Sequence, residues 1–193
     1  MLNDLQITTL EREGYVIIED LFTSEDLHPI KDEFSMLVEH QAQKLYQAGR
    51  LSDLYQDQPF EHRLAEIAAE VPEAISALFP NGRFHKGEAL FQFMKHPKIL
   101  DRVECLVGTE ILCHPSYNIH PRLTGGYTSS HQDAGYYLPD GDETLIIACL
   151  VPLSILRLKW MFVGCAASTP RRCFSSCLGR GWTKSLVGRY NAV

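Results

Sequence analysis

The spacing of apolar residues changes near Gly108, and this change limits the folds that the sequence can adopt. Before it, apart from one strand-like segment near the start, apolar side chains recur at the period of a helix that buries one face. After it, residues 110 to 120 alternate, residues 123 to 127 are rich in turn formers, and an apolar run spans residues 145 to 153. This later pattern is typical of β-strands. Helices that precede a run of strands predict an α+β fold, namely a double-stranded β-helix of the jelly-roll type with flanking N-terminal helices.

The first elements have clear boundaries in the sequence. Gly14 to Phe22 is rich in β-branched and aromatic residues and predicts a strand. Thr23, with Asp26 three residues later, predicts the start of a helix that stops at Gly49. Its expected core face consists of apolar residues at helical spacing: Leu27, Ile30, Phe34, Leu37, Val38 and Leu45. His28 and His40 on the same helix are expected to be solvated.

Shorter helices are expected after this one. Residues 60 to 70 are amphipathic, and Pro72 can occupy the first turn of the next helix. His96 to Val107 predicts another helix, because Gly108 follows it as a C-terminal stop.

One domain is expected, because 193 residues with 45% hydrophobic content suit one substantial core and are too few for two comfortable ones. No signal peptide is recognised at the acidic start, and the longest apolar run is too short to cross a bilayer. The expected location is therefore cytoplasmic, with no membrane span. Six scattered cysteines suit reduced thiols, and Cys105, Cys113 and Cys149 are expected in the core because their neighbours are apolar.

His131, Gln132 and Asp133 form the pattern with the most specific chemistry. On a strand, residues i and i+2 project from the same face, so the His131 imidazole and the Asp133 carboxylate can converge on one cation. Two histidines and one carboxylate on one face of an octahedron suit non-haem Fe(II). A third ligand must then come from a distant strand. The alternative is a surface histidine beside a turn aspartate, since so short a pattern also occurs by chance.

The segments around this pattern support the iron interpretation. Glu110 to Pro121 reads as a strand, a loop rich in Gly, Thr and Ser follows, and the aromatic pair Tyr136 and Tyr137 precedes the apolar strand from Thr144 to Leu153. This succession resembles the phytanoyl-CoA dioxygenase family, and the resemblance covers about residues 10 to 153. The opening strand and the first helix start are also similar to those of the family.

The resemblance implies a dioxygenase that uses Fe(II), 2-oxoglutarate and O2 to hydroxylate a small-molecule or lipid-like substrate. His131 and Asp133 match the first two iron ligands of the family, and Asn118 matches a position that commonly contacts 2-oxoglutarate. Tyr117 and Gln132 lie in the same matched stretches and are further candidates for binding this cosubstrate. No nucleic-acid ligand is expected, and the resemblance points to no particular protein partner.

Other polar residues of this region are weaker candidates. Ser116 lies in the stretch of Asn118, whereas Tyr136 and Tyr137 would lie near the substrate entrance, although packing is the more frequent role of such tyrosines. His114 and His120 are expected not to bind the iron, because a proline follows each of them and disturbs the strand.

The composition changes abruptly after Leu153. Residues 1 to 153 carry 11 Lys and Arg and 24 Asp and Glu, whereas residues 154 to 193 carry 7 Lys and Arg, no acidic residue and no histidine. The family pattern calls here for an Asn-Gly-Cys strand, a Pro-Gly-Ser-His turn, a distal His ligand and an Arg that binds 2-oxoglutarate. None is present. We therefore expect residues 1–153 to be the N-terminal part of an oxygenase domain and residues 154–193 to be an aberrant basic tail.

The origin of the tail is open at this point. A frame-shifted translation explains why composition, charge and periodicity change together, and it makes the chain an incomplete, inactive copy. A natural variant whose basic tail contacts an anion or nucleic acid is a second interpretation, and a zinc site at Cys165, Cys173 and Cys177 is a third, with irregular spacing. At the level of function, the alternative is a non-catalytic pseudoenzyme or binding module on the same scaffold.

Overall fold

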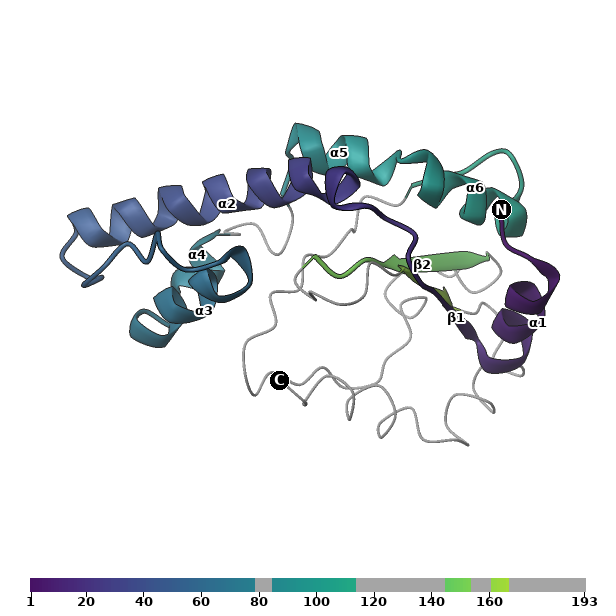
Figure 1. Cartoon of the computed structure of the whole chain (residues 1–193), viewed down its shortest axis with the longest axis horizontal. Coiled ribbons are helices and arrows are strands. Elements are labelled where there is room, and N and C mark those ends of the chain that lie inside the picture. Colours follow the sequence, from purple (N-terminus) through teal and green to yellow (C-terminus); the bar gives the residue numbers. More distant parts are fainter. Residues whose placement is uncertain (79–84, 114–144, 154–160, 167–193) are drawn as a thin grey trace.

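A computed structural model describes residues 1–78, 85–113, 145–153 and 161–166 of the chain. In this part of the chain, several helices lie above a small antiparallel sheet in the view of Figure 1, the first helix lies at the end of the strands, and others lie away from the sheet. The strands are β1 (Tyr15–Ile18), β2 (Ile146–Leu150) and β3 (Met161–Ala166).

The described sheet has the order β1-β3-β2, so β3 pairs along both of its edges. Gly164 of β3 is aligned with Tyr15 of β1 on one side and with Ala148 of β2 on the other. β3 thereby joins two strands that lie far apart in the sequence.

The first helix, α1 (Asp4–Glu13), has a complete capping box. The Asn3 side chain accepts a hydrogen bond from the Gln6 N–H at 2.9 Å, and the Gln6 side chain accepts one from the Asn3 N–H at 3.0 Å. Gly14 ends the helix with φ of 78°, a left-handed conformation that favours glycine. No helix was expected here from the sequence.

The long helix α2 (Ser24–Gln47) begins as predicted, because Thr23 and Asp26 form a capping box. It ends just before Gly49, whose φ is 65°. Its predicted core face is confirmed: Leu27, Ile30, Phe34 and Leu45 are buried, and Leu37 and Val38 are half-buried. His28 and His40 are exposed, also as predicted.

The remaining described helices are α3 (Phe60–Glu70), α4 (Ala74–Leu78), α5 (Glu88–Met94) and α6 (Pro97–Val107). The positions of α3 and α6 agree with the sequence predictions, including the stop at Gly108. Helix α4 begins two residues after Pro72, which had been expected in its first turn. Helix α5 was not expected.

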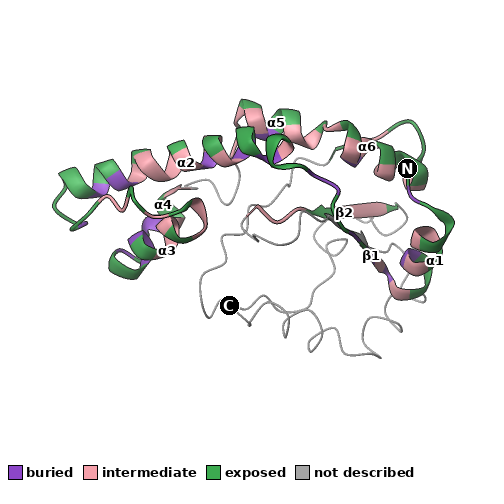
Figure 2. Ribbon diagram, viewed as in Figure 1, coloured by how far each residue is buried: buried purple, intermediate pink, exposed green. Residues whose placement is uncertain are grey.

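Buried side chains of the described residues form three clusters, and each includes at least one residue of α2; Figure 2 colours the buried residues purple. The first lies between α1, β1 and α6, the second between the far half of α2, α3 and α4, and the third between α2 and α5. The first cluster includes Val16, Ile18, Phe22 and Ile99. The second includes Ala42, Leu45, Ile67 and Val71. The third consists of Ile30, Phe34 and Leu90. Helix α2 is thus the element that connects the sheet region to the α3–α4 lobe.

Some predictions about local structure were wrong. The strand predicted for residues 14 to 22 stops at Ile18, because the chain turns at Asp20, which has φ of 50°. Residues 110 to 113 form no strand, although the alternation predicted one. Cys105, Cys113 and Cys149 were expected in the core, but their side chains are exposed. Apolar neighbours in the sequence do not show which face of an element a small side chain occupies.

The strand β3 lies within the segment that we expected to be an aberrant tail. Regular structure therefore does not end at Leu153. The sequence analysis missed this strand because a short continuous apolar run has no alternation to reveal it. Most of the strands predicted for the jelly roll fall in residues 114–144, which lie outside the described residues, so the double-stranded β-helix stays a prediction.

Candidate functional site

The residues predicted to form the iron and 2-oxoglutarate site all lie outside the described residues. They are His131 and Asp133 for the metal, and Tyr117, Asn118 and Gln132 for the cosubstrate. The secondary candidates Ser116, Tyr136 and Tyr137, and the rejected ligands His114 and His120, also fall there. These residues all lie in the segment 114–144. The structure describes the helices and strands that precede and follow this segment.

Cys113 is the last described residue before this segment, and β2 begins at Ile146 just after it. The Cys149 thiol in β2 reaches solvent but has many protein atoms around it. This desolvation, together with the neighbouring Cys113 thiol, raises the pKa of Cys149 to about 11.

Asp26 connects the start of α2 to the start of α6. Its carboxylate accepts a hydrogen bond from the Thr23 N–H at 2.7 Å, forms an ion pair with Lys98 and lies 3.3 Å from Nε2 of His96. The hydrogen bond from Lys98, followed by that from the Thr23 N–H, holds the pKa of Asp26 well below its ordinary value. The ionised Asp26 side chain therefore holds the start of α2 against the start of α6.

His96 has a structural role at the same junction. It is the N-cap of α6, where its Nδ1 accepts a hydrogen bond from the Lys98 N–H at 3.1 Å. Its ring packs edge-on against Phe22 with 5.6 Å between ring centroids. Since both ring nitrogens and the ring face have neighbours, His96 serves packing and capping.

Glu33 makes the corresponding connection between α2 and α5. Its carboxylate accepts hydrogen bonds from the backbone N–H groups of Ala89 at 2.8 Å and Leu90 at 3.1 Å, and lies 3.0 Å from Nε2 of His85. The side chains of Glu33 and His85 are 14% and 17% exposed, so this contact is largely shielded from water. Sequence reasoning missed it, because the partners lie 52 to 57 positions apart.

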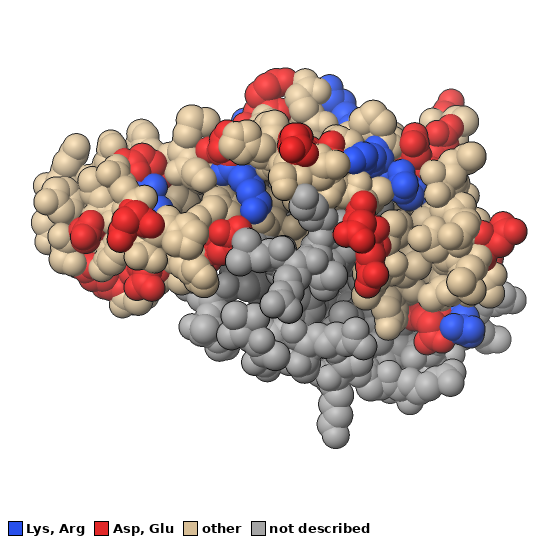
Figure 3. Space-filling model, in the orientation of Figure 1, with Lys and Arg blue, Asp and Glu red and all other residues tan. Residues whose placement is uncertain are grey.

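Further ion pairs join α2 to α3. Lys31 Nζ lies 3.0 Å from Glu61 Oε1, and Arg63 pairs with Glu39 while also donating to the Leu54 carbonyl. Figure 3 shows basic and acidic side chains interspersed on this face of the described residues. These ion pairs hold α3 against α2.

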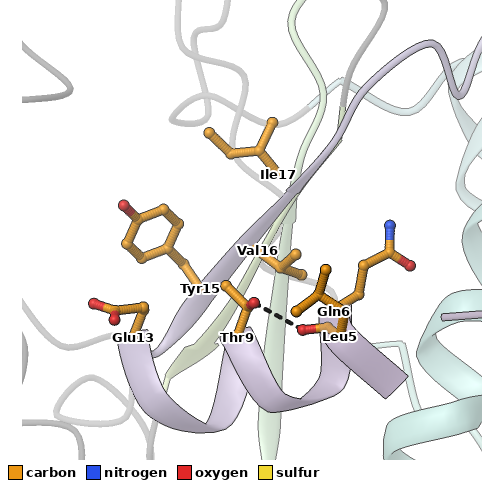
Figure 4. A pocket seen from close by; sticks show the side chains of 7 residues that line it. All are labelled: Leu5, Gln6, Thr9, Glu13, Tyr15, Val16 and Ile17. Carbon is orange, nitrogen blue, oxygen red and sulfur yellow. Dashed lines mark hydrogen bonds between the residues drawn. The ribbon is translucent and has the colours of Figure 1, made fainter. Parts of the chain in front are cut away.

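A depression of about 320 Å³ lies between α1 and β1 (Figure 4). Its lining is mostly apolar and consists of Leu5, Gln6, Thr9, Glu13, Tyr15, Val16 and Ile17. The Thr9 hydroxyl donates to the Leu5 carbonyl at 2.7 Å, and the titratable side chains Glu13 and Tyr15 lie together at one end. This lining has no histidine or cysteine and does not resemble the predicted iron site.

Within the described ranges, no group of three or more His, Cys, Asp or Glu side chains is placed to hold a metal ion. The predicted iron ligands are not among those residues, so this finding does not test them. No helix in the same ranges is long and apolar enough to cross a membrane.

The family of the chain follows from comparison with known protein families. The model of the phytanoyl-CoA dioxygenase family matches residues 10–154, which is most of the chain. Members of this family are generally Fe(II)/2-oxoglutarate-dependent oxygenases with a jelly-roll fold. Neither the curated proteins nor the solved structures contain a match to the chain. The family match includes every predicted site residue and ends where the composition changes. The chain therefore belongs to the phytanoyl-CoA dioxygenase family.

Proposed function

We propose that this sequence encodes most of an Fe(II)- and 2-oxoglutarate-dependent dioxygenase that hydroxylates a small-molecule or lipid-like substrate, and that the chain as it stands cannot complete the reaction. The family match over residues 10–154 is the observation that supports this function most strongly. A cytoplasmic location stays a prediction.

His131 and Asp133 would hold the iron. A neutral imidazole and a carboxylate both suit Fe(II), and the carboxylate offsets part of the charge of the cation. Bound iron, with 2-oxoglutarate and O2, supplies the oxidising chemistry that hydroxylates a C–H bond. The third ligand of the family is a distal histidine, and residues 154–193 contain no histidine that could match it.

The cosubstrate would be held by Asn118, Tyr117 and Gln132. The family also uses an arginine that pairs with the far carboxylate of 2-oxoglutarate, and no arginine of the tail stands in a matching context. A charge-assisted hydrogen bond of this kind contributes about 1.5–3 kcal/mol, which is roughly a tenfold to hundredfold difference in affinity. The missing arginine and the missing third ligand act on the same complex, so their effects should compound.

The genetic code supports a displaced reading frame as the origin of the tail. Trp and Met each have a single codon, so Trp160, Met161 and Phe162 must be encoded by TGG, ATG and TTT or TTC. Read one base later, these bases encode Gly-Cys, whichever Phe codon is used. The preceding codon, for Lys159, then contributes Asn if it is AAA and Ser if it is AAG. The displaced frame can therefore contain the Asn-Gly-Cys that the family pattern requires after Leu153.

Succinate formation tests the proposed function. We expect the purified 193-residue chain, supplied with Fe(II) and 2-oxoglutarate, to form no succinate. A chain that continues in the displaced frame after Leu153 should form it, and His131→Ala or Asp133→Ala in that longer chain should abolish it. His40→Ala is the matched control, because His40 is exposed on α2 and is assigned no role.

Two results would overturn the proposal. Succinate formation by the short chain that is lost in His131→Ala would show that the 193 residues already supply a third ligand. A longer chain that binds neither iron nor 2-oxoglutarate would favour the alternative, a non-catalytic binding module on this scaffold.

A further inference from the structure

We draw no further inference here: the strongest candidate, the apolar depression between α1 and β1 with the exposed side chains of Leu5 and Ile17, carries nothing because the described residues show no segment or partner that covers it.

Discussion

The Glu33 carboxylate occupies the space beside Gly87 at the junction of α2 and α5, so this space is open only because residue 87 has no side chain. A Cβ atom at Gly87 would lie 2.1 Å from Nε2 of His85 and 2.2 Å from the Glu33 carboxylate, closer than non-bonded atoms approach. The φ of Gly87 is −103°, which any residue can adopt, so the need for glycine here is steric. The same carboxylate accepts hydrogen bonds from the first residues of α5.

Gly87→Ala is therefore expected to lower the free energy of unfolding by about 1–3 kcal/mol, because the added methyl displaces a carboxylate that is largely buried and hydrogen-bonded. Urea unfolding followed by far-ultraviolet circular dichroism measures this change on the helices. In the Glu33→Ala, His85→Ala background the same substitution should cost much less, since both side chains that the methyl would displace are gone. Equal costs in both backgrounds would contradict this explanation.

Asp26 predicts a dependence of stability on pH. Its folded pKa lies below its unfolded value, so its contribution to stability is fully present above the unfolded pKa, which is about 3.9, and is lost as pH falls toward the folded pKa. Asp26→Asn should lower the free energy of unfolding by about 1–3 kcal/mol at pH 7. This deficit should shrink below about pH 4, where the wild-type carboxyl becomes protonated in the unfolded state.

The matched control for Asp26 is Asp32→Asn on the same helix. Among the described residues Asp32 pairs with His28 alone, and both side chains are more than half exposed, so its replacement should have little effect. A deficit of Asp26→Asn that stays constant from pH 7 to pH 3 would show that the carboxylate is not the stabilising group.

Helices that carry their own start and stop residues were predictable from the sequence. The start of α2 at Thr23 and the end of α6 at Gly108 depend on side chains within a few positions of each boundary. Helix α1 also has such signals in Asn3, Gln6 and Gly14, although the sequence analysis did not use them. Helix α5 has no side-chain cap, and its start is held by Glu33 from another helix, which local sequence cannot reveal.

The N-cap of α6 gives a prediction at the scale of this element. His96→Ala removes the acceptor for the Lys98 N–H and should lower the free energy of unfolding by about 0.5–2 kcal/mol. His96→Asn should recover part of this loss, because an asparagine side chain can accept the same hydrogen bond. Urea unfolding of both variants compares them directly. If His96→Asn were as unstable as His96→Ala, packing against Phe22 would be the main role of this ring.

The β-strands were less predictable than the helices. β2 falls inside the apolar run recognised in the sequence, but β3 was missed and β1 is shorter than expected. A strand obtains its hydrogen bonds from partners that are distant in the chain, so its length and place depend on the sheet as a whole. For β3, the partners are residues 15–18 and 146–150.

At the scale of the whole molecule, the displaced frame makes a prediction about the gene. The codon of Lys159 should be AAA, and the frame read one base later should stay open from there and encode a further histidine and arginine. Sequencing the transcript across codons 150 to 193 tests this. A stop codon soon after the Gly-Cys codons, or AAG at Lys159, would instead favour a natural variant with a basic tail.

The sequence by itself determined the family, the helix boundaries that have local caps, and the residues proposed for the iron site, among them His131 and Asp133. These depend on residue types at short spacings, which the chain displays without being folded. Only the tertiary structure decided that Glu33 anchors α5, that Cys149 reaches solvent, and that Met161–Ala166 lies between β1 and β2. Each of these depends on which distant segments come into contact, and burial, hydrogen bonding and strand pairing between such segments are set by the packing of the whole chain.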